Sequence, residues 1–190
     1  MDENLAYQEE QREELIGGRI VAMSPRPSFH HNRVASNIFW IFENYLRKKQ
    51  CIAIADGTDL YLTEDDHFIP DVMIVCDPDK IRSDGVHGAP DLVVEVLSPS
   101  TAKNDRAYKK DVYERCGVRE YWIVNPADKT VEQYYLRDGK FSLHETYTIL
   151  PDWMLAKMKP EEQERVAKSF RCSLYDDLVI HLEDIFARIP

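Results

Sequence analysis

The spacing of apolar and polar residues predicts short strands separated by two amphipathic helices. Apolar residues at helical spacing predict helices over 30–49 and 103–116, and Gly117 is placed to end the second helix. A Gly-Gly pair between two apolar runs predicts a hairpin over 14–23. The segment 77–90 is expected to be a polar loop, and 160–170 a charged segment that is helical or mobile. Apolar runs bounded by Gly, Pro or Asp predict strands at 51–55, 58–63, 69–76, 89–101, 120–124, 130–136, 140–147 and 178–182.

An acid interrupts one of these strands. Glu95 stands among Val and Leu residues, with Pro90 and Pro99 on either side. An unpaired ionised carboxylate is costly in an apolar strand, so Glu95 must meet a cation, a metal or a proton. Asp71 begins the preceding buried strand, and two converging carboxylates suit Mg²⁺ or Mn²⁺. The alternative is that Asp71 caps a turn and Glu95 pairs with an arginine; two acids in successive strands favour the metal site.

The predicted helix that follows Glu95 has a lysine, Lys109, on the side that faces the core. Asp105, Lys109, Val112 and Cys116 are four, three and four residues apart, so they share one stripe whose apolar end faces the core. An ion pair of Asp105 with Lys109 explains the aspartate, but it does not explain a lysine beside a buried acid. An ammonium near a metal-bound water can orient that water and offset charge on a phosphate. The leading hypothesis is therefore metal-dependent hydrolysis of phosphodiesters.

These motifs resemble the Uma family of restriction endonucleases, within the PD-(D/E)XK nuclease superfamily. The resemblance rests on Pro70-Asp71-Val72, on 90–101 and on 105–126, and it extends over 14–174. It implies an α/β (α+β) fold with a restriction-endonuclease-like core, in which helices flank a central mixed β-sheet. It also implies a Mg²⁺- or Mn²⁺-dependent endonuclease acting on DNA, with Asp71 and Glu95 as metal ligands. The superfamily lysine position is Leu97 here, and the family places Lys109 in that role.

Other residues are accessory candidates around this centre. By the resemblance Glu14 is a further metal or water ligand, although on sequence alone it is equally a solvated charge. His31 either contacts substrate phosphate or is a structural histidine at a helix start, and Asp105 is the third accessory candidate. A basic cluster that either follows a nucleic-acid backbone or forms a solvated helix face comprises Lys103, Arg106 and Lys110.

Composition limits the remaining possibilities. The 190 residues are expected to form one domain over 1–190. The net charge of −10 argues against a general coat for nucleic acid, so DNA binding would need a local basic patch. No apolar run is long enough to span a membrane, and no secretion signal is evident. The cysteines have no metal-binding spacing and are expected to be reduced thiols of a cytoplasmic protein; they are Cys51, Cys76, Cys116 and Cys172.

Two other functions stay open on the same fold. The acidic charge, Leu97 and the apolar late strands are compatible with a catalytically weak or inactive module for nucleic-acid or protein binding. Hydrolysis of a non-nucleic phosphoester would share the metal site. A homodimer is compatible with the resemblance, since many such nucleases pair to cut two strands.

Overall fold

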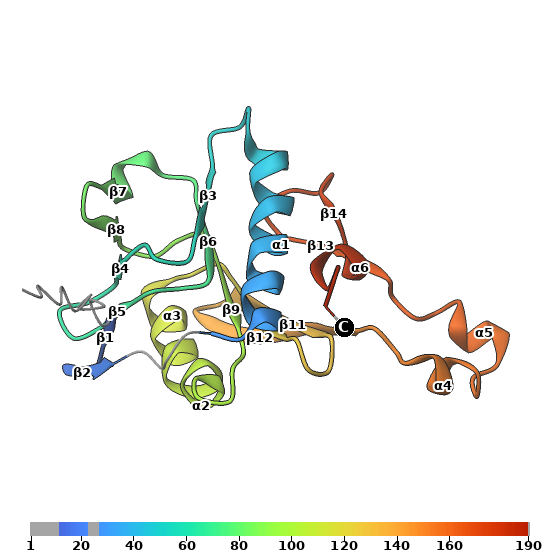
Figure 1. The fold of residues 1–190 in the computed structure, drawn as a ribbon. Helices are drawn as coiled ribbons and strands as arrows, with labels where there is room; N and C mark the ends of the chain where they lie inside the picture. The colour runs from blue at the N-terminus through green and yellow to red at the C-terminus, as the bar shows by residue number, and fades with distance from the viewer. Residues whose placement is uncertain (1–11, 23–26, 190) are drawn as a thin grey trace, which may run out of the picture.

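A six-stranded mixed sheet forms the centre of the computed structural model, which describes residues 12–22 and 27–189 (Figure 1). Strands β9 and β10 are parallel, and every other pair of neighbours in the sheet is antiparallel. Val72 lies opposite Val94, so the next pair outward is Asp71 and Glu95. The order across the sheet is β12 (Lys140–Thr148), β11 (Thr130–Arg137), β10 (Glu120–Asn125), β9 (Leu92–Val96), β6 (Val72–Val75) and β3 (Ile52–Ala55).

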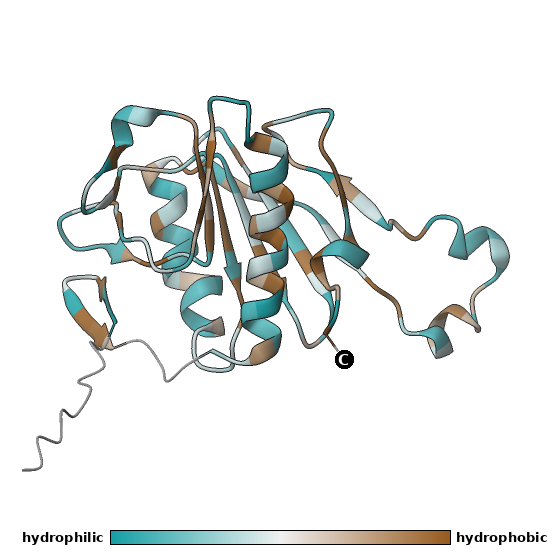
Figure 2. Ribbon diagram, turned by 45° about the horizontal axis from the view of Figure 1, so that its top comes forward, coloured by the Kyte–Doolittle hydropathy of each residue, from teal (hydrophilic) through white to brown (hydrophobic). Residues whose placement is uncertain are grey.

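One face of this sheet is covered by α1 (Phe29–Leu46). The Ser28 side chain caps the helix by accepting a hydrogen bond from His31 N at 3.2 Å. The apolar stripe of α1, which includes Val34, Ile38 and Phe42, is buried against the strands. Figure 2 shows apolar residues along the strands between α1 and the opposite helical layer. Also on the α1 side are β13 (Ser169–Arg171), β14 (Val179–His181) and α6 (Leu182–Ile185).

The other face is covered by one helical stretch with an irregular centre. It runs through α2 (Ala102–Asn104), the π-helical segment η2 (Asp105–Lys109) and α3 (Lys110–Cys116). Gly117 adopts a φ of 90° and donates its N–H to carbonyls of the last turn, which confirms the predicted helix end. A π-helical turn is wider than an α-helical turn and occurs often at functional sites. Asp105 and Lys109, the two polar residues on the predicted buried stripe, both lie in the π-helical segment η2.

A second six-stranded sheet carries the predicted hairpin. Gly17 and Gly18, with φ of 59° and 72°, form its turn, and Leu15 pairs with His67. This pairing attaches the hairpin to the strand that precedes Asp71. The order in the sheet is β2 (Arg19–Ala22), β1 (Glu13–Ile16), β5 (His67–Phe68), β4 (Leu60–Tyr61), β8 (Gly85–His87) and β7 (Ile81–Arg82).

Two local predictions were wrong. The expected polar loop 77–90 contains a 3₁₀ helix, η1 (Pro78–Lys80), and the two short strands β7 and β8. Helix α1 ends at Leu46, so the basic residues 47–49 follow the helix instead of forming its last turn. The helical alternative for the charged segment 160–170 is confirmed in part, because Pro160–Gln163 form one turn of helix, α5, which projects from the sheets together with α4 (Asp152–Leu155) (Figure 1).

The expectation of four reduced cysteines was also wrong. Cys51 and Cys76 form a disulfide, whereas Cys116 and Cys172 are free. The reason is the antiparallel pairing of β3 with β6, in which Ile52 lies opposite Val75 and the two cysteines form the next pair outward. Separately, no helix in the described part of the chain is long and apolar enough to cross a bilayer.

Candidate functional site

Lys109 lies at the centre of a buried acidic cluster. Its Nζ is 2.8 Å from Glu14 Oε1, 3.3 Å from Glu95 Oε1 and 3.6 Å from Asp105 Oδ1. Lys109 is 3% exposed, so the inward direction predicted from helical spacing is confirmed. The three acids come from β1, β9 and η2, and none is more than 7% exposed. The cluster therefore connects the hairpin, the central sheet and the π-helical segment.

Neutral groups complete part of this cluster. Tyr113 donates its hydroxyl to Glu95 Oε1 at 2.7 Å, and the Ile69 backbone N–H donates to Glu14 Oε1 at 3.0 Å. Lys109 Nζ is also 5.5 Å from the centre of the Phe68 ring. Asp105 is different, because neither of its buried carboxylate oxygens receives a hydrogen bond within the described part of the chain. Its carboxylate lacks the donors that buried acids normally have.

The cluster contains more acidic side chains than basic ones. Burial raises the pKa of Glu95 well above its ordinary value, and it raises the pKa of Asp105 to about 6. Burial alone would lower the pKa of Lys109, but the surrounding carboxylates outweigh it and raise that pKa, so the ammonium stays protonated. Three carboxyl groups thus share one cation, and a further positive charge would stabilise their ionised forms.

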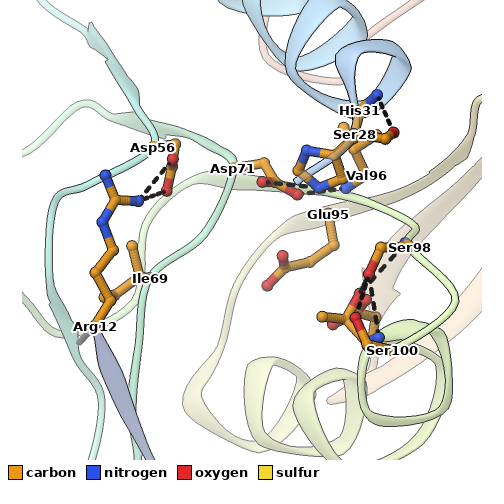
Figure 3. Close-up of polar contacts among 12 residues, drawn as sticks. Arg12, Ser28, His31, Asp56, Ile69, Asp71, Glu95, Val96, Ser98 and Ser100 are labelled. Atoms are coloured by element: carbon orange, nitrogen blue, oxygen red, sulfur yellow. Dashed lines mark hydrogen bonds and ion pairs between the residues drawn. The ribbon is translucent and has the colours of Figure 1, made fainter. Parts of the chain in front are cut away.

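Asp71 occupies the neighbouring part of the site. Its Oδ2 accepts a hydrogen bond from Val96 N at 2.7 Å, and its Oδ1 is 3.3 Å from His31 Nε2. Figure 3 shows the Asp71 carboxylate turned toward Val96 and the start of α1, while the Glu95 side chain extends in another direction. Burial lowers the pKa of His31, but the hydrogen bond and charge of Asp71 outweigh burial and raise it. The strand register therefore brings Asp71 close to Glu95, with their carboxylates held by different partners.

The donor chemistry fits a hard divalent cation without forming a complete cage. Among the described residues, no group of three His, Cys, Asp or Glu side chains is arranged as a ready set of ligands. Mg²⁺ commonly uses one or two protein carboxylates and takes its other ligands from water and substrate phosphate. The carboxylate oxygens of Asp105 accept no hydrogen bond from the described residues, so they are free to bind a cation nearby. Glu95 also has a free oxygen within the described part of the chain, because both of its side-chain hydrogen bonds there go to Oε1. Glu14 has its Oε1 committed to Lys109 and to Ile69 N.

The predicted basic cluster lies outside the acidic one. Lys103 is exposed on α2. Arg106 pairs with Glu132 on β11 at 2.6 Å, and Lys110 Nζ lies 3.9 Å from the centre of the Tyr134 ring. Two of these three side chains are thus engaged on the outer part of the sheet, and contact of any of them with a nucleic-acid backbone stays a prediction.

Sequence reasoning missed a further buried acid, Asp66, that organises the site. Asp66 Oδ1 accepts from Tyr108 OH at 2.9 Å and from Gly17 N at 3.2 Å, and its Oδ2 accepts from Arg115 at 2.6 Å. Burial opposes ionisation of Asp66, but these hydrogen bonds outweigh it and lower its pKa. Asp66 thereby joins the turn after Glu14 to the helix that carries Lys109. Apart from Thr63, which donates to Oδ2 from three residues away, these partners are 42 to 49 residues distant, so the local sequence does not indicate the role of Asp66. Tyr113, in contrast, follows Lys109 by one helical turn, which was a usable signal.

Comparison with known proteins gives consistent matches. The family model Uma2, described as "Putative restriction endonuclease", matches residues 1–161. An uncharacterised protein of Synechocystis sp. (strain PCC 6803) is 32% identical over 141 residues, which cover 72% of this chain and 74% of that protein. A crystal structure described as a "putative nuclease" of DUF820 from Anabaena variabilis ATCC 29413 superposes with a TM-score of 0.68. That match has 19% identity and covers 93% of this chain and 90% of the other, so it shows a shared fold.

Proposed function

Because the chain belongs to the Uma2 family, which is described as "Putative restriction endonuclease", we propose that it is a metal-dependent endonuclease that hydrolyses phosphodiester bonds of DNA. The observation that carries this proposal is the acidic cluster around Lys109, in which three carboxyl groups share one ammonium. Such a cluster attracts a divalent cation. It also keeps a permanently charged ammonium next to a candidate metal ligand, where it could stabilise negative charge that develops during hydrolysis of a phosphodiester.

Each residue of the site would have its own role in the reaction. Asp71 and Glu95 would hold Mg²⁺ or Mn²⁺, which supplies Lewis acidity at a phosphate oxygen and lowers the pKa of a water molecule. Val96 N and His31 hold the Asp71 carboxylate in place from two sides. Tyr113 fixes one oxygen of Glu95 and leaves the other for a ligand. The Lys109 ammonium, 3.3 Å from Glu95, would orient the attacking water and offset negative charge that develops on the phosphate.

One observation favours a second function. Lys109 already forms ion pairs with Glu14 and Glu95, so the cluster partly neutralises itself. A buried ion-pair network of this kind can be a structural element. A non-catalytic module for nucleic-acid or protein binding on the same fold would use it in that way.

Two measurements separate these functions. Supercoiled plasmid should be nicked in the presence of Mg²⁺ or Mn²⁺ but not of EDTA, and both Asp71→Asn and Glu95→Gln should abolish nicking. Glu145→Gln, at an exposed acid of β12, is the control and should cleave normally. Calorimetric titration with Mn²⁺ tests the metal without DNA and should show binding that Glu95→Gln weakens. Nicking that survives both site substitutions would refute this centre, and absence of both metal binding and nicking would favour the binding module.

A further inference from the structure

The Asp105 carboxylate is buried without a hydrogen-bond donor. Asp105 is 1% exposed, and within the described part of the chain neither of its carboxylate oxygens accepts a hydrogen bond. The Thr101 hydroxyl is near enough to influence this carboxylate, but it forms its hydrogen bond with Ser98 Oγ at 3.0 Å. Lys109 Nζ is 3.6 Å from Asp105 Oδ1, which is beyond hydrogen-bond distance. Because a buried charged group without donors is costly, this carboxylate indicates a ligand from outside the chain.

The backbone of Asp105 is fixed, although its carboxylate is not bonded. Tyr121 on β10 is fully buried and donates its hydroxyl to Asp105 O at 2.9 Å. Asp105 is also the first residue of η2, and a π-helical turn of this kind occurs often at functional sites. The sheet and the helix therefore hold the Asp105 side chain against the acidic cluster without neutralising it.

The neighbours of this carboxylate favour a cation. Glu95 Oε1 and Asp105 Oδ1 lie 3.3 and 3.6 Å from the same Lys109 Nζ, so the two carboxylates face one small volume. Carboxylate oxygens are the ligands that hard divalent cations prefer. A simple ion pair with Lys109 explains Asp105 less well, because Glu14 and Glu95 are nearer partners of that ammonium. The cluster thus has an acid that its own cation does not need.

We propose that Asp105 is a ligand of the metal ion, shared with Glu95 and contributed by the helical layer. The proposal rests on the proposed function, because it concerns the same metal centre. Asp71 and Glu95 both belong to the central sheet, whereas Asp105 belongs to η2. Metal binding would therefore fasten the π-helical segment to β9. Since Lys109 is the last residue of that segment, the same binding would fix the ammonium in its place.

Binding of Mn²⁺ without DNA tests this role. In calorimetric titration of the full chain, Asp105→Asn should weaken Mn²⁺ affinity at least roughly 10-fold, since a ligand should matter no less than an outer-shell partner. Asp105→Glu, which keeps a carboxylate, should bind Mn²⁺ more tightly than Asp105→Asn. The matched control is Asp111→Asn, at an exposed acid of α3, and it should bind like the wild type.

Two further readouts separate a metal ligand from a structural ion pair. The luminescence decay of bound Tb³⁺ in H₂O and in D₂O measures how much water the ion keeps, and Asp105→Asn at saturating Tb³⁺ should increase that hydration. In EDTA, Asp105→Asn should melt at or above the wild-type temperature, because it removes one of three acids that share an ammonium. A fixed concentration of Mn²⁺ should then raise the melting temperature of the wild type more than that of the variant.

Three results would overturn the inference: equal Mn²⁺ affinity of Asp105→Asn and Asp111→Asn, unchanged hydration of bound Tb³⁺, or no Mn²⁺ binding by the wild type. A lower melting temperature of Asp105→Asn in EDTA with unchanged Mn²⁺ affinity would make Asp105 a structural partner of Lys109. The proposed function fails separately. A protein that binds Mn²⁺ through Asp105 but never nicks plasmid refutes only the catalysis. Mn²⁺-dependent nicking by Asp105→Asn with unchanged affinity refutes only the role of Asp105.

Discussion

Replacing Lys109 with methionine should strongly destabilise the fold, and it should do so more at high pH. Methionine keeps the length and apolar stem of the side chain but removes the ammonium that Glu14, Glu95 and Asp105 share. At an effective dielectric constant of about 20, each of these contacts is worth about 5 kcal/mol before desolvation. Desolvation of Lys109, which is 3% exposed, cancels most of that sum. The expected net loss is about 3–5 kcal/mol, the usual result of removing one partner from a buried ionic cluster.

The pH dependence follows from the raised pKa values of the acids. Burial raises the pKa of Asp105 to about 6, so between about pH 4 and that value the folded state binds more protons than the unfolded state. Stability therefore falls as pH rises through this window. In Lys109→Met the carboxyl groups lose the positive charge that holds their pKa values down. Their pKa values therefore rise further, and the decrease in stability with pH extends to higher pH. The loss caused by Lys109→Met should be at least about 1.4 kcal/mol larger at pH 8 than at pH 5, equivalent to one pKa unit.

Urea denaturation at the two pH values measures both effects. Lys110→Met, the next residue on the helix and only half-buried, is the matched control and should change stability by less than about 1 kcal/mol. Adding Glu14→Gln to Lys109→Met should recover part of the loss, because it removes one of the excess acids. A loss that equals the control, or one that is the same at pH 5 and pH 8, would refute this account of the cluster.

Three other perturbations test features outside the catalytic proposal. Asp66→Asn should lower the free energy of unfolding by about 1–3 kcal/mol at pH 7. Because the Asp66 pKa is lowered in the folded state, urea titrations should show this difference between variant and wild type shrinking below about pH 4, and a difference that stays constant would contradict the reasoning. Reduction of the Cys51–Cys76 disulfide, which spans 25 residues, should cost about 3 kcal/mol, and an unchanged melting temperature with dithiothreitol would count against the bond. Gly17→Ala should cost about 1–2 kcal/mol, since φ there is 59°, and thermal denaturation showing no loss would contradict that conformation.

The features that sequence analysis predicted well depend on residues close together in the chain. The Gly17-Gly18 turn, helix α1 and the end of the second helix at Gly117 each follow from a few neighbouring residues. The direction of Lys109 was also predictable, because the apolar stripe of its own helix decides it. The π-helical turn was not predicted, since it changes the spacing of one turn without changing the composition.

The features that were missed depend on pairing between distant segments. The Cys51–Cys76 bond exists because β3 lies beside β6, and neither cysteine carries a local signal for it. Strands β7 and β8 have only two and three residues, too few for a periodic pattern, so the segment resembled a loop. The contacts of Asp66 also cross between elements, and only the folded chain brings them together.

The separation of Glu14 and Lys109 has a consequence for the newly made chain. The two residues are 95 positions apart, yet they form one buried ion pair. At a synthesis rate of about 5–20 residues per second, Glu14 is added to the chain roughly 5–20 s before Lys109. During that interval the first hairpin can form its turn but cannot bury its acid at low cost. The N-terminal strands should therefore dock late, after the helix that carries Lys109 has emerged, and pulse-labelled hydrogen exchange on stalled nascent chains would reveal this order.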